Sequence, residues 1–151
     1  MIEPLLGKLR EGYDMAVASR FLPGASDEDA GRWLPVRSWG NRAFTWIANR
    51  LWNRGRYLTD TINGFRAVTK SAFRRMNTTA CGFSIELEMS VRAMRLGLKV
   101  AELATRETAR AGGRSKAATF AGGLEMCRTL WTEWRRGDKA DDGKCRLFPL
   151  S

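Results

Sequence analysis

The sequence of 151 residues contains no histidine, which excludes His-based catalytic triads, histidine metal sites and imidazole general bases within this chain. Its three cysteines, Cys81, Cys127 and Cys145, are far apart and odd in number, so we expect neither a disulfide framework nor a zinc site. No apolar run is long enough for a membrane-spanning helix, and the N-terminus has no signal-peptide pattern. The length and the hydrophobic content of 44% are typical of one globular domain.

Acidic residues are scarce, and the formal net charge is +10. Between Arg32 and Arg75 the only acid is Asp60, against ten arginines and lysines. Such a concentration of positive charge attracts nucleic acid, anionic lipid headgroups or phosphorylated substrates. The alternative interpretation is a soluble protein with a basic, solvated surface. We do not expect a nucleic-acid partner, because the sequence has no helix-turn-helix, zinc or RNA-binding signature.

Apolar periodicity predicts the order of the main elements. A helix over residues 2–9 precedes a short apolar strand over 15–18, and a helix through 83–94 precedes a strand over 100–105. A glycine separates each helix from its strand. This order predicts an α/β fold, in which ligands bind beyond the carboxyl ends of parallel strands.

Two further segments, 38–54 and 116–136, read as amphipathic helices that carry both arginine and tryptophan. The first holds three tryptophans, at positions 39, 46 and 52. Tryptophan favours sites with one apolar and one wet side, so this helix lies either at a membrane interface or in an aromatic core. The second suits an interfacial helix, and it equally suits a helix that packs on a partner.

The loop Arg110–Lys116 combines three cations with two adjacent glycines. The glycines allow the backbone to approach a ligand closely, and the cations suit phosphate oxygens. The spacing does not match a Walker P-loop, and a solvated turn is the alternative interpretation.

The carboxylates offer few metal or acid–base candidates. The Asp-x-Asp spacing at Asp27 and Asp29 lies in a loop rather than at a strand end, so we do not expect it to bind a metal. Glu86 and Glu88 are two residues apart on a helix, so at most one faces a site, and solvation is the alternative for each. Asp60 either lines a reacting centre or forms a structural salt bridge.

Four segments in this order resemble the family 2 glycosyltransferases, in their dolichyl-phosphate mannosyltransferase-like branch. The resemblance covers roughly residues 1–130. The segments that carry it are Tyr13–Phe21, Asp60–Ala67, Gly82–Leu103 and Arg110–Lys116.

The resemblance implies a partial GT-A (Rossmann-like) nucleotide-diphospho-sugar transferase fold with amphipathic interfacial helices. The N-terminal nucleotide-binding half of such enzymes carries an Asp-x-Asp that holds Mg²⁺ or Mn²⁺, and we expect that half to be absent here. Residues 1–112 would be the C-terminal half of the GT-A domain, 113–136 the end of the phosphate loop with its amphipathic helix, and 137–151 a flexible tail. We therefore expect no metal bound by this chain alone and no activity in isolation, whether it is a fragment, a truncated gene or half of a split enzyme.

The resemblance also implies a reaction: inverting transfer of a hexose from a nucleotide-sugar to a polyprenyl phosphate. The expected location is cytoplasmic and peripheral, at the anionic inner face of the membrane. Asp60 and Arg66 would line the reacting centre. The residues expected to hold phosphate are Ser19, Arg20, Arg110, Arg114, Ser115 and Lys116. The alternative is a non-enzymatic basic module, derived from such an enzyme, that binds a membrane surface or a protein.

Overall fold

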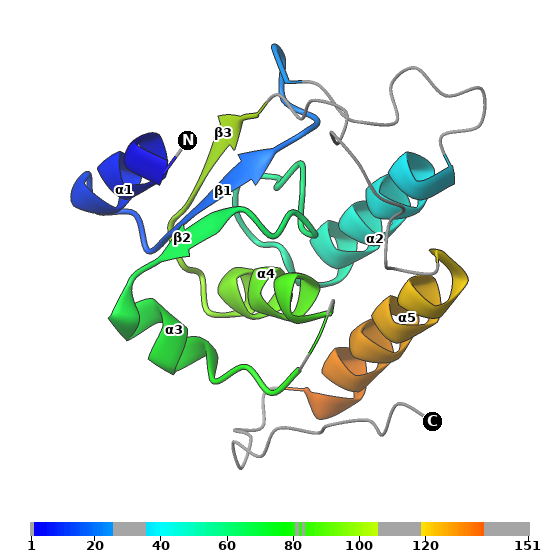
Figure 1. Cartoon of the computed structure of the whole chain (residues 1–151). Helices are drawn as coiled ribbons and strands as arrows, with labels where there is room; N and C mark the ends of the chain where they lie inside the picture. Colours follow the sequence, from blue (N-terminus) through cyan, green and yellow to red (C-terminus); the bar gives the residue numbers. More distant parts are fainter. Residues whose placement is uncertain (1, 26–35, 81, 83, 106–118, 138–151) are drawn as a thin grey trace.

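The computed structural model describes residues 2–25, 36–80, 82, 84–105 and 119–137, which form a mixed α/β fold (Figure 1). Within these residues there are five helices and a sheet of three strands. In chain order the elements are α1 (Ile2–Arg10), β1 (Met15–Ser19), α2 (Val36–Trp52), β2 (Arg66–Val68), α3 (Lys70–Met76), α4 (Ile85–Arg95), β3 (Val100–Ala104) and α5 (Thr119–Arg136).

The predicted helix–glycine–strand order is confirmed. The glycines that end α1 and α4, Gly12 and Gly97, have φ values of 92° and 61°, which a residue without Cβ adopts readily. The predicted helix over 38–54 begins and ends two residues earlier, at Val36 and Trp52. Among the described residues, no helix combines the length and the apolar character needed to cross a bilayer.

The sheet has the order β2-β1-β3, with β1 buried along its whole length. Strand β3 runs parallel to β1, with Val17 opposite Glu102. Strand β2 runs antiparallel to β1, with Ala16 opposite Ala67. The parallel pair brings the residues after β1 to the same edge as the end of β3.

The elements stack in layers (Figure 1). Helix α1 covers one face of the sheet, where Leu5 packs with Ala16 and Ala101. Helices α3 and α4 cover the other face, against Met15 and Val17 of β1. Helices α2 and α5 form a further layer on the far side of α4, in the cluster of Ala48, Leu58, Leu87, Val91, Met94, Met126 and Leu130.

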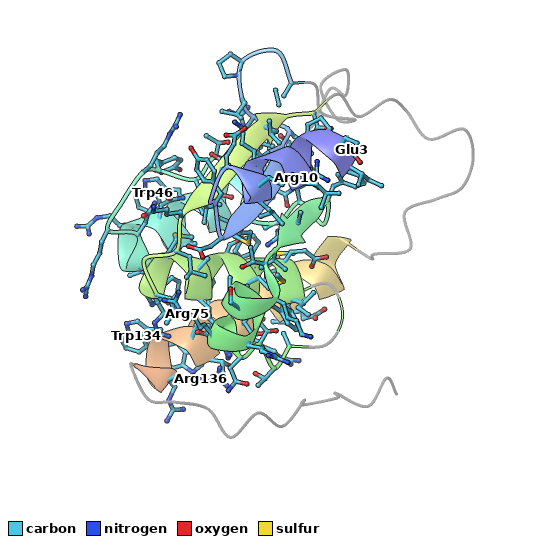
Figure 2. The ribbon with its side chains drawn as sticks, turned by 90° about the vertical axis from the view of Figure 1, so that its left-hand side faces the viewer. Glu3, Arg10, Trp46, Arg75, Trp134 and Arg136 are labelled. Carbon is cyan, nitrogen blue, oxygen red and sulfur yellow. The ribbon has the colours of Figure 1, made fainter. Side chains whose placement is uncertain are left out.

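Helix α2 is oriented differently from a simple amphipathic helix. Thr45 and Asn49 from its polar face are buried, whereas Trp39 and Trp46 are each 60% exposed, and Figure 2 shows Trp46 at the outer surface. Of the two alternatives for this helix, the aromatic core therefore does not hold for these two tryptophans. The physical reason is that Asn49 hydrogen-bonds to the backbone of Leu58, so the buried side of α2 includes part of its polar face beside Ala48.

Candidate functional site

Polar side chains meet at the carboxyl ends of β1 and β3, where the segment 58–66 crosses the strands. Ser19 Oγ lies 2.6 Å from Thr59 Oγ1. Thr59 Oγ1 in turn donates to Glu102 Oε1 at 2.9 Å. The same Glu102 oxygen accepts from the backbone N–H groups of Thr59 and Asp60, at 2.8 and 3.0 Å. A strand carboxylate thus fixes the backbone that carries Asp60.

Arg20 and Asp60 form a buried, bidentate ion pair. Arg20 Nε donates to Asp60 Oδ2 at 2.7 Å, and Nη2 donates to Oδ1 at 3.0 Å. Their side chains are 7% and 0% exposed, so solvent screens the pair weakly. The sequence placed these two residues in one site, and the structure joins them directly.

The Asp60 carboxylate already accepts as many hydrogen bonds as it can hold. Besides the guanidinium, it accepts from the backbone N–H groups of Arg20, Ile62 and Asn63. A carboxylate offers about four lone-pair sites. In this arrangement Asp60 orients Arg20 and shapes the turn. These contacts agree with the alternative of a structural salt bridge for Asp60. Its assignment to the reacting centre stays a prediction.

Arg66 acts as a bridge between the segment 58–66 and α4. Its guanidinium donates to the carbonyls of Asn63 at 2.6 Å and Glu86 at 2.8 Å, and to Ser90 Oγ at 3.2 Å. Burial lowers the pKa of Arg66 to about 10, so the group is still a cation at neutral pH. Its contacts make it a positioning residue, and a role at the reacting centre stays a prediction.

Glu86 and Glu88 have different environments. One carboxylate oxygen of Glu86 is buried without a hydrogen-bond partner, and burial raises the pKa of this group. A Cβ added at Gly64 would lie 3.1 Å from Glu86 Oε1, so the glycine leaves room for the carboxylate. Glu88 is 2% exposed, so the alternative of a solvated side chain does not hold for it.

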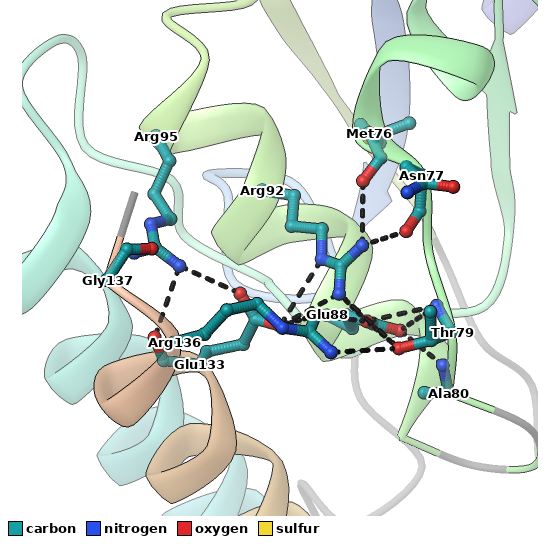
Figure 3. A network of polar contacts seen from close by, with 10 residues as sticks. All are labelled: Met76, Asn77, Thr79, Ala80, Glu88, Arg92, Arg95, Glu133, Arg136 and Gly137. Carbon is teal, nitrogen blue, oxygen red and sulfur yellow. Dashed lines mark hydrogen bonds and ion pairs between the residues drawn. The ribbon is translucent and has the colours of Figure 1, made fainter. Parts of the chain in front are cut away.

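Glu88 belongs to an ionic cluster between α4 and α5 (Figure 3). It accepts from the backbone N–H groups of Thr79 and Ala80, and Arg92 Nη2 lies 2.5 Å from it. Arg92 also bonds Glu133 of α5 at 3.1 Å. Buried charges are stable only when they are paired, and the charges of this cluster are paired between α4 and α5. The cluster therefore holds these two helices together.

Several predicted site residues lie outside the described part of the chain. These are Arg110, Arg114, Ser115 and Lys116 of the predicted phosphate loop. Asp27 and Asp29, which we do not expect to bind a metal, also lie outside it. The part of the chain that the structure does describe contains no cluster of three His, Cys, Asp or Glu residues suited to a metal ion.

Sequence reasoning missed Thr59 and Glu102. A signal was present for Glu102, because it is the one charged residue within the strand Val100–Ala104. A charge in a half-buried strand needs partners, and here they come from a segment about forty residues earlier in the chain.

The Glu102 contacts predict a pH dependence of stability. Burial raises the pKa of Glu102 above its ordinary value of 4.5. Its contribution to folding is therefore complete below pH 4.5 and is lost as the pH rises through the folded-state pKa. We expect the free energy of unfolding of Glu102→Gln to fall less from pH 4.5 to neutrality than that of the native chain. Urea titrations across this range measure the difference, and parallel curves would contradict the prediction.

Comparison with known proteins points to one class. No protein-family model matches the chain. Over 103 residues it is 34% identical to Glycosyltransferase AglJ of Haloferax volcanii. The match covers 67% of this chain but only 31% of that relative. The mixed α/β fold is compatible with part of a glycosyltransferase domain, and the chain is thus similar, over two thirds of its length, to one portion of a glycosyltransferase.

Proposed function

We propose that this chain is the acceptor-side part of a family 2 glycosyltransferase of the dolichyl-phosphate mannosyltransferase-like type, with a GT-A fold. The complete enzyme would transfer a hexose from a nucleotide-sugar to a polyprenyl phosphate, with inversion at the sugar carbon. It would act at the cytoplasmic face of a membrane. The observation that carries this proposal is the identity of 34% with a glycosyltransferase over 67% of the chain.

The proposed chemistry needs little acid–base help. A phosphate monoester is already an anion at neutral pH. One of its oxygens forms the bond to the anomeric carbon. The bond from that carbon to the nucleotide diphosphate breaks, and its electron pair leaves on the diphosphate. No proton has to be removed from the acceptor, so positioning and charge stabilisation are the tasks of the protein.

The residues of this chain would divide those tasks. Arg110, Arg114, Ser115 and Lys116 would hold the acceptor phosphate, because forked and point cations suit its oxygens. Ser19 and Arg20, at the carboxyl end of β1, would face the same phosphate. The buried carboxylate of Asp60 fixes the orientation of Arg20 for this role.

The described residues do not fit a divalent metal. They contain no suitable cluster of ligands, and Asp60 is saturated with hydrogen bonds. The Mg²⁺ or Mn²⁺ of the complete enzyme would therefore be held by residues other than those described, together with the nucleotide.

Binding of a short prenyl phosphate tests the acceptor site. We expect farnesyl phosphate to bind more tightly than farnesol, which has the same tail without the anion. Arg114→Gln should weaken binding of farnesyl phosphate roughly 10- to 100-fold, since a charge-assisted hydrogen bond contributes about 1.5–3 kcal/mol. Isothermal titration in a neutral detergent measures both affinities.

The matched control is Lys139→Gln, which removes one charge from the segment 137–151 and should leave the affinity unchanged. Equal binding of the phosphate and the alcohol would count against a phosphate acceptor. If Arg114→Gln and Lys139→Gln weakened the binding of farnesyl phosphate equally, the effect would come from the net charge of the chain and not from a specific phosphate site.

A further inference from the structure

Two acidic residues are neighbours near the carboxyl ends of β1 and β3, and in the described part of the chain only one of them forms an ion pair. Asp60 forms the bidentate pair with Arg20, at 2.7 and 3.0 Å. Glu102 Oε1 accepts from the backbone N–H of Asp60 at 3.0 Å, so the two acidic residues are in direct contact. Glu102 is half-buried, and its charge is therefore only partly solvated.

All the hydrogen-bond partners of Glu102 within the described residues are uncharged. They are the backbone N–H groups of Thr59 and Asp60, at 2.8 and 3.0 Å, and the Thr59 hydroxyl at 2.9 Å. Asp60, in contrast, is paired with a guanidinium and also accepts from the backbone N–H groups of three residues. Of the two carboxylates, Glu102 is therefore the one whose charge is less stabilised.

Asp60 is the charged group that acts on Glu102 from the elements around it. Strand β1 places the apolar Val17 opposite Glu102. Arg66, the second guanidinium near Asp60, donates to carbonyl oxygens, and the carboxylate that acts on it most strongly is Glu86. Burial and the charge of Asp60 raise the pKa of Glu102 above its ordinary value of 4.5, and the hydrogen bonds to Glu102 offset this only in part.

The fold alone does not explain a carboxylate at position 102. A glutamine there could accept the same three hydrogen bonds through its side-chain oxygen, without a half-buried charge next to Asp60. Carboxylates in such unfavourable surroundings are concentrated at functional sites. The charge of Glu102 thus indicates a role in the site itself.

A phosphate held by Arg20 would bring further negative charge to these residues. A phosphate monoester carries about −1.5 to −2 charges at neutral pH. The guanidinium already neutralises Asp60, so it screens the phosphate from Glu102 only in part. A like charge nearby favours the protonated form of a carboxyl group. Protonation of Glu102 relieves this repulsion and leaves the ion pair intact.

We propose that binding of the acceptor phosphate at Arg20 is linked to the uptake of a proton by the Glu102 carboxylate. The linkage rests on the proposed function, because it takes the acceptor to be a phosphate bound at the carboxyl end of β1. The proton comes from solvent and converts Glu102 to a neutral acid. The carbonyl oxygen of that acid still accepts from Thr59 and Asp60, so the turn that carries Asp60 keeps its hydrogen bonds.

Acidification should strengthen the binding of phosphate through Glu102. The pKa of Glu102 is higher in the complex than in the free chain. Between these two values binding takes up a proton, and the affinity rises as the pH falls. The second ionisation of the phosphate, at about pH 6, acts in the opposite direction because the dianion binds better. That ionisation belongs to the ligand, so a comparison of the native chain with a variant cancels it.

Isothermal titration with farnesyl phosphate, in two buffers of different ionisation enthalpy, measures the protons exchanged on binding. Between about pH 5 and 7 the native chain should take up about half a proton more than Glu102→Gln, for a pKa difference of about one. At neutral pH, Glu102→Gln should bind farnesyl phosphate roughly tenfold more tightly than the native chain, because a pKa difference of about one corresponds to a factor of ten.

The control is Glu3→Gln, which removes an equal but exposed charge from α1 and should leave the affinity and the proton exchange unchanged. Carboxyl carbon NMR of the native chain follows the pKa of Glu102 directly, so the test does not depend on the folding of a variant. A pKa that farnesyl phosphate does not change, or equal tightening by Glu3→Gln and Glu102→Gln, would overturn the linkage. Absence of any binding of farnesyl phosphate would instead overturn the proposed acceptor, and the linkage with it.

Discussion

Replacement of Asp60 by alanine should lower the free energy of unfolding by about 3–5 kcal/mol, because it removes the carboxylate that pairs with the buried guanidinium of Arg20. The same change removes the acceptor for the backbone N–H groups of Ile62 and Asn63. The loss should therefore appear as destabilisation of the whole chain and not only as a defect of binding. Urea unfolding followed by far-UV circular dichroism measures it.

Two variants separate the causes of the Asp60 effect. Asp60→Asn keeps an oxygen that can accept from the turn but loses the charge, and its cost should be smaller than that of alanine. Glu3→Ala removes an exposed partner that lies 3.7 Å from Arg10, and it should change stability by no more than about 1 kcal/mol. If Asp60→Ala cost no more than Glu3→Ala, the pair would not stabilise the fold.

Replacement of Glu133 by alanine should cost a similar amount, about 3–5 kcal/mol, and should loosen α5 from α4. The Glu133 carboxylate accepts from Arg92, Arg95 and Arg136, at 3.1, 3.0 and 2.9 Å. Figure 3 shows these three guanidinium groups around it. Without Glu133 the three guanidinium groups would lose the one carboxylate that contacts all of them. Amide hydrogen exchange in α5 should then accelerate, and urea unfolding gives the total loss.

A control within α5 tests whether the ionic cluster is responsible. Arg128→Ala removes an exposed charge from the outer side of the same helix and should change stability by less than about 0.5 kcal/mol. A double-mutant cycle between Glu88 and Glu133 measures their coupling through Arg92. Unchanged exchange in α5 after Glu133→Ala would show that apolar contacts alone hold the helix.

The two ionic groups also differ in what the sequence could have predicted of them. Arg20 was a candidate because it follows a predicted strand, and Asp60 because it is the one acid between Arg32 and Arg75, but their pairing joins residues forty positions apart. Glu133 had no signal, since a carboxylate on an amphipathic helix ordinarily faces solvent. Its burial depends on arginines that α4 presents to it, and these are defined only when the helices pack.

The sequence by itself determined the local elements and their order. Apolar spacing and the glycines at 12 and 97 specify α1, β1, α4 and β3, because these signals act between residues within one or two turns. Only the tertiary structure decided which side of α2 is buried, how Glu102 holds the segment with Asp60, and that Glu133 of α5 is buried among arginines. The physical reason is that these polar side chains are buried because distant parts of the chain provide their hydrogen bonds. Such partners cannot be predicted from the local spacing of apolar residues.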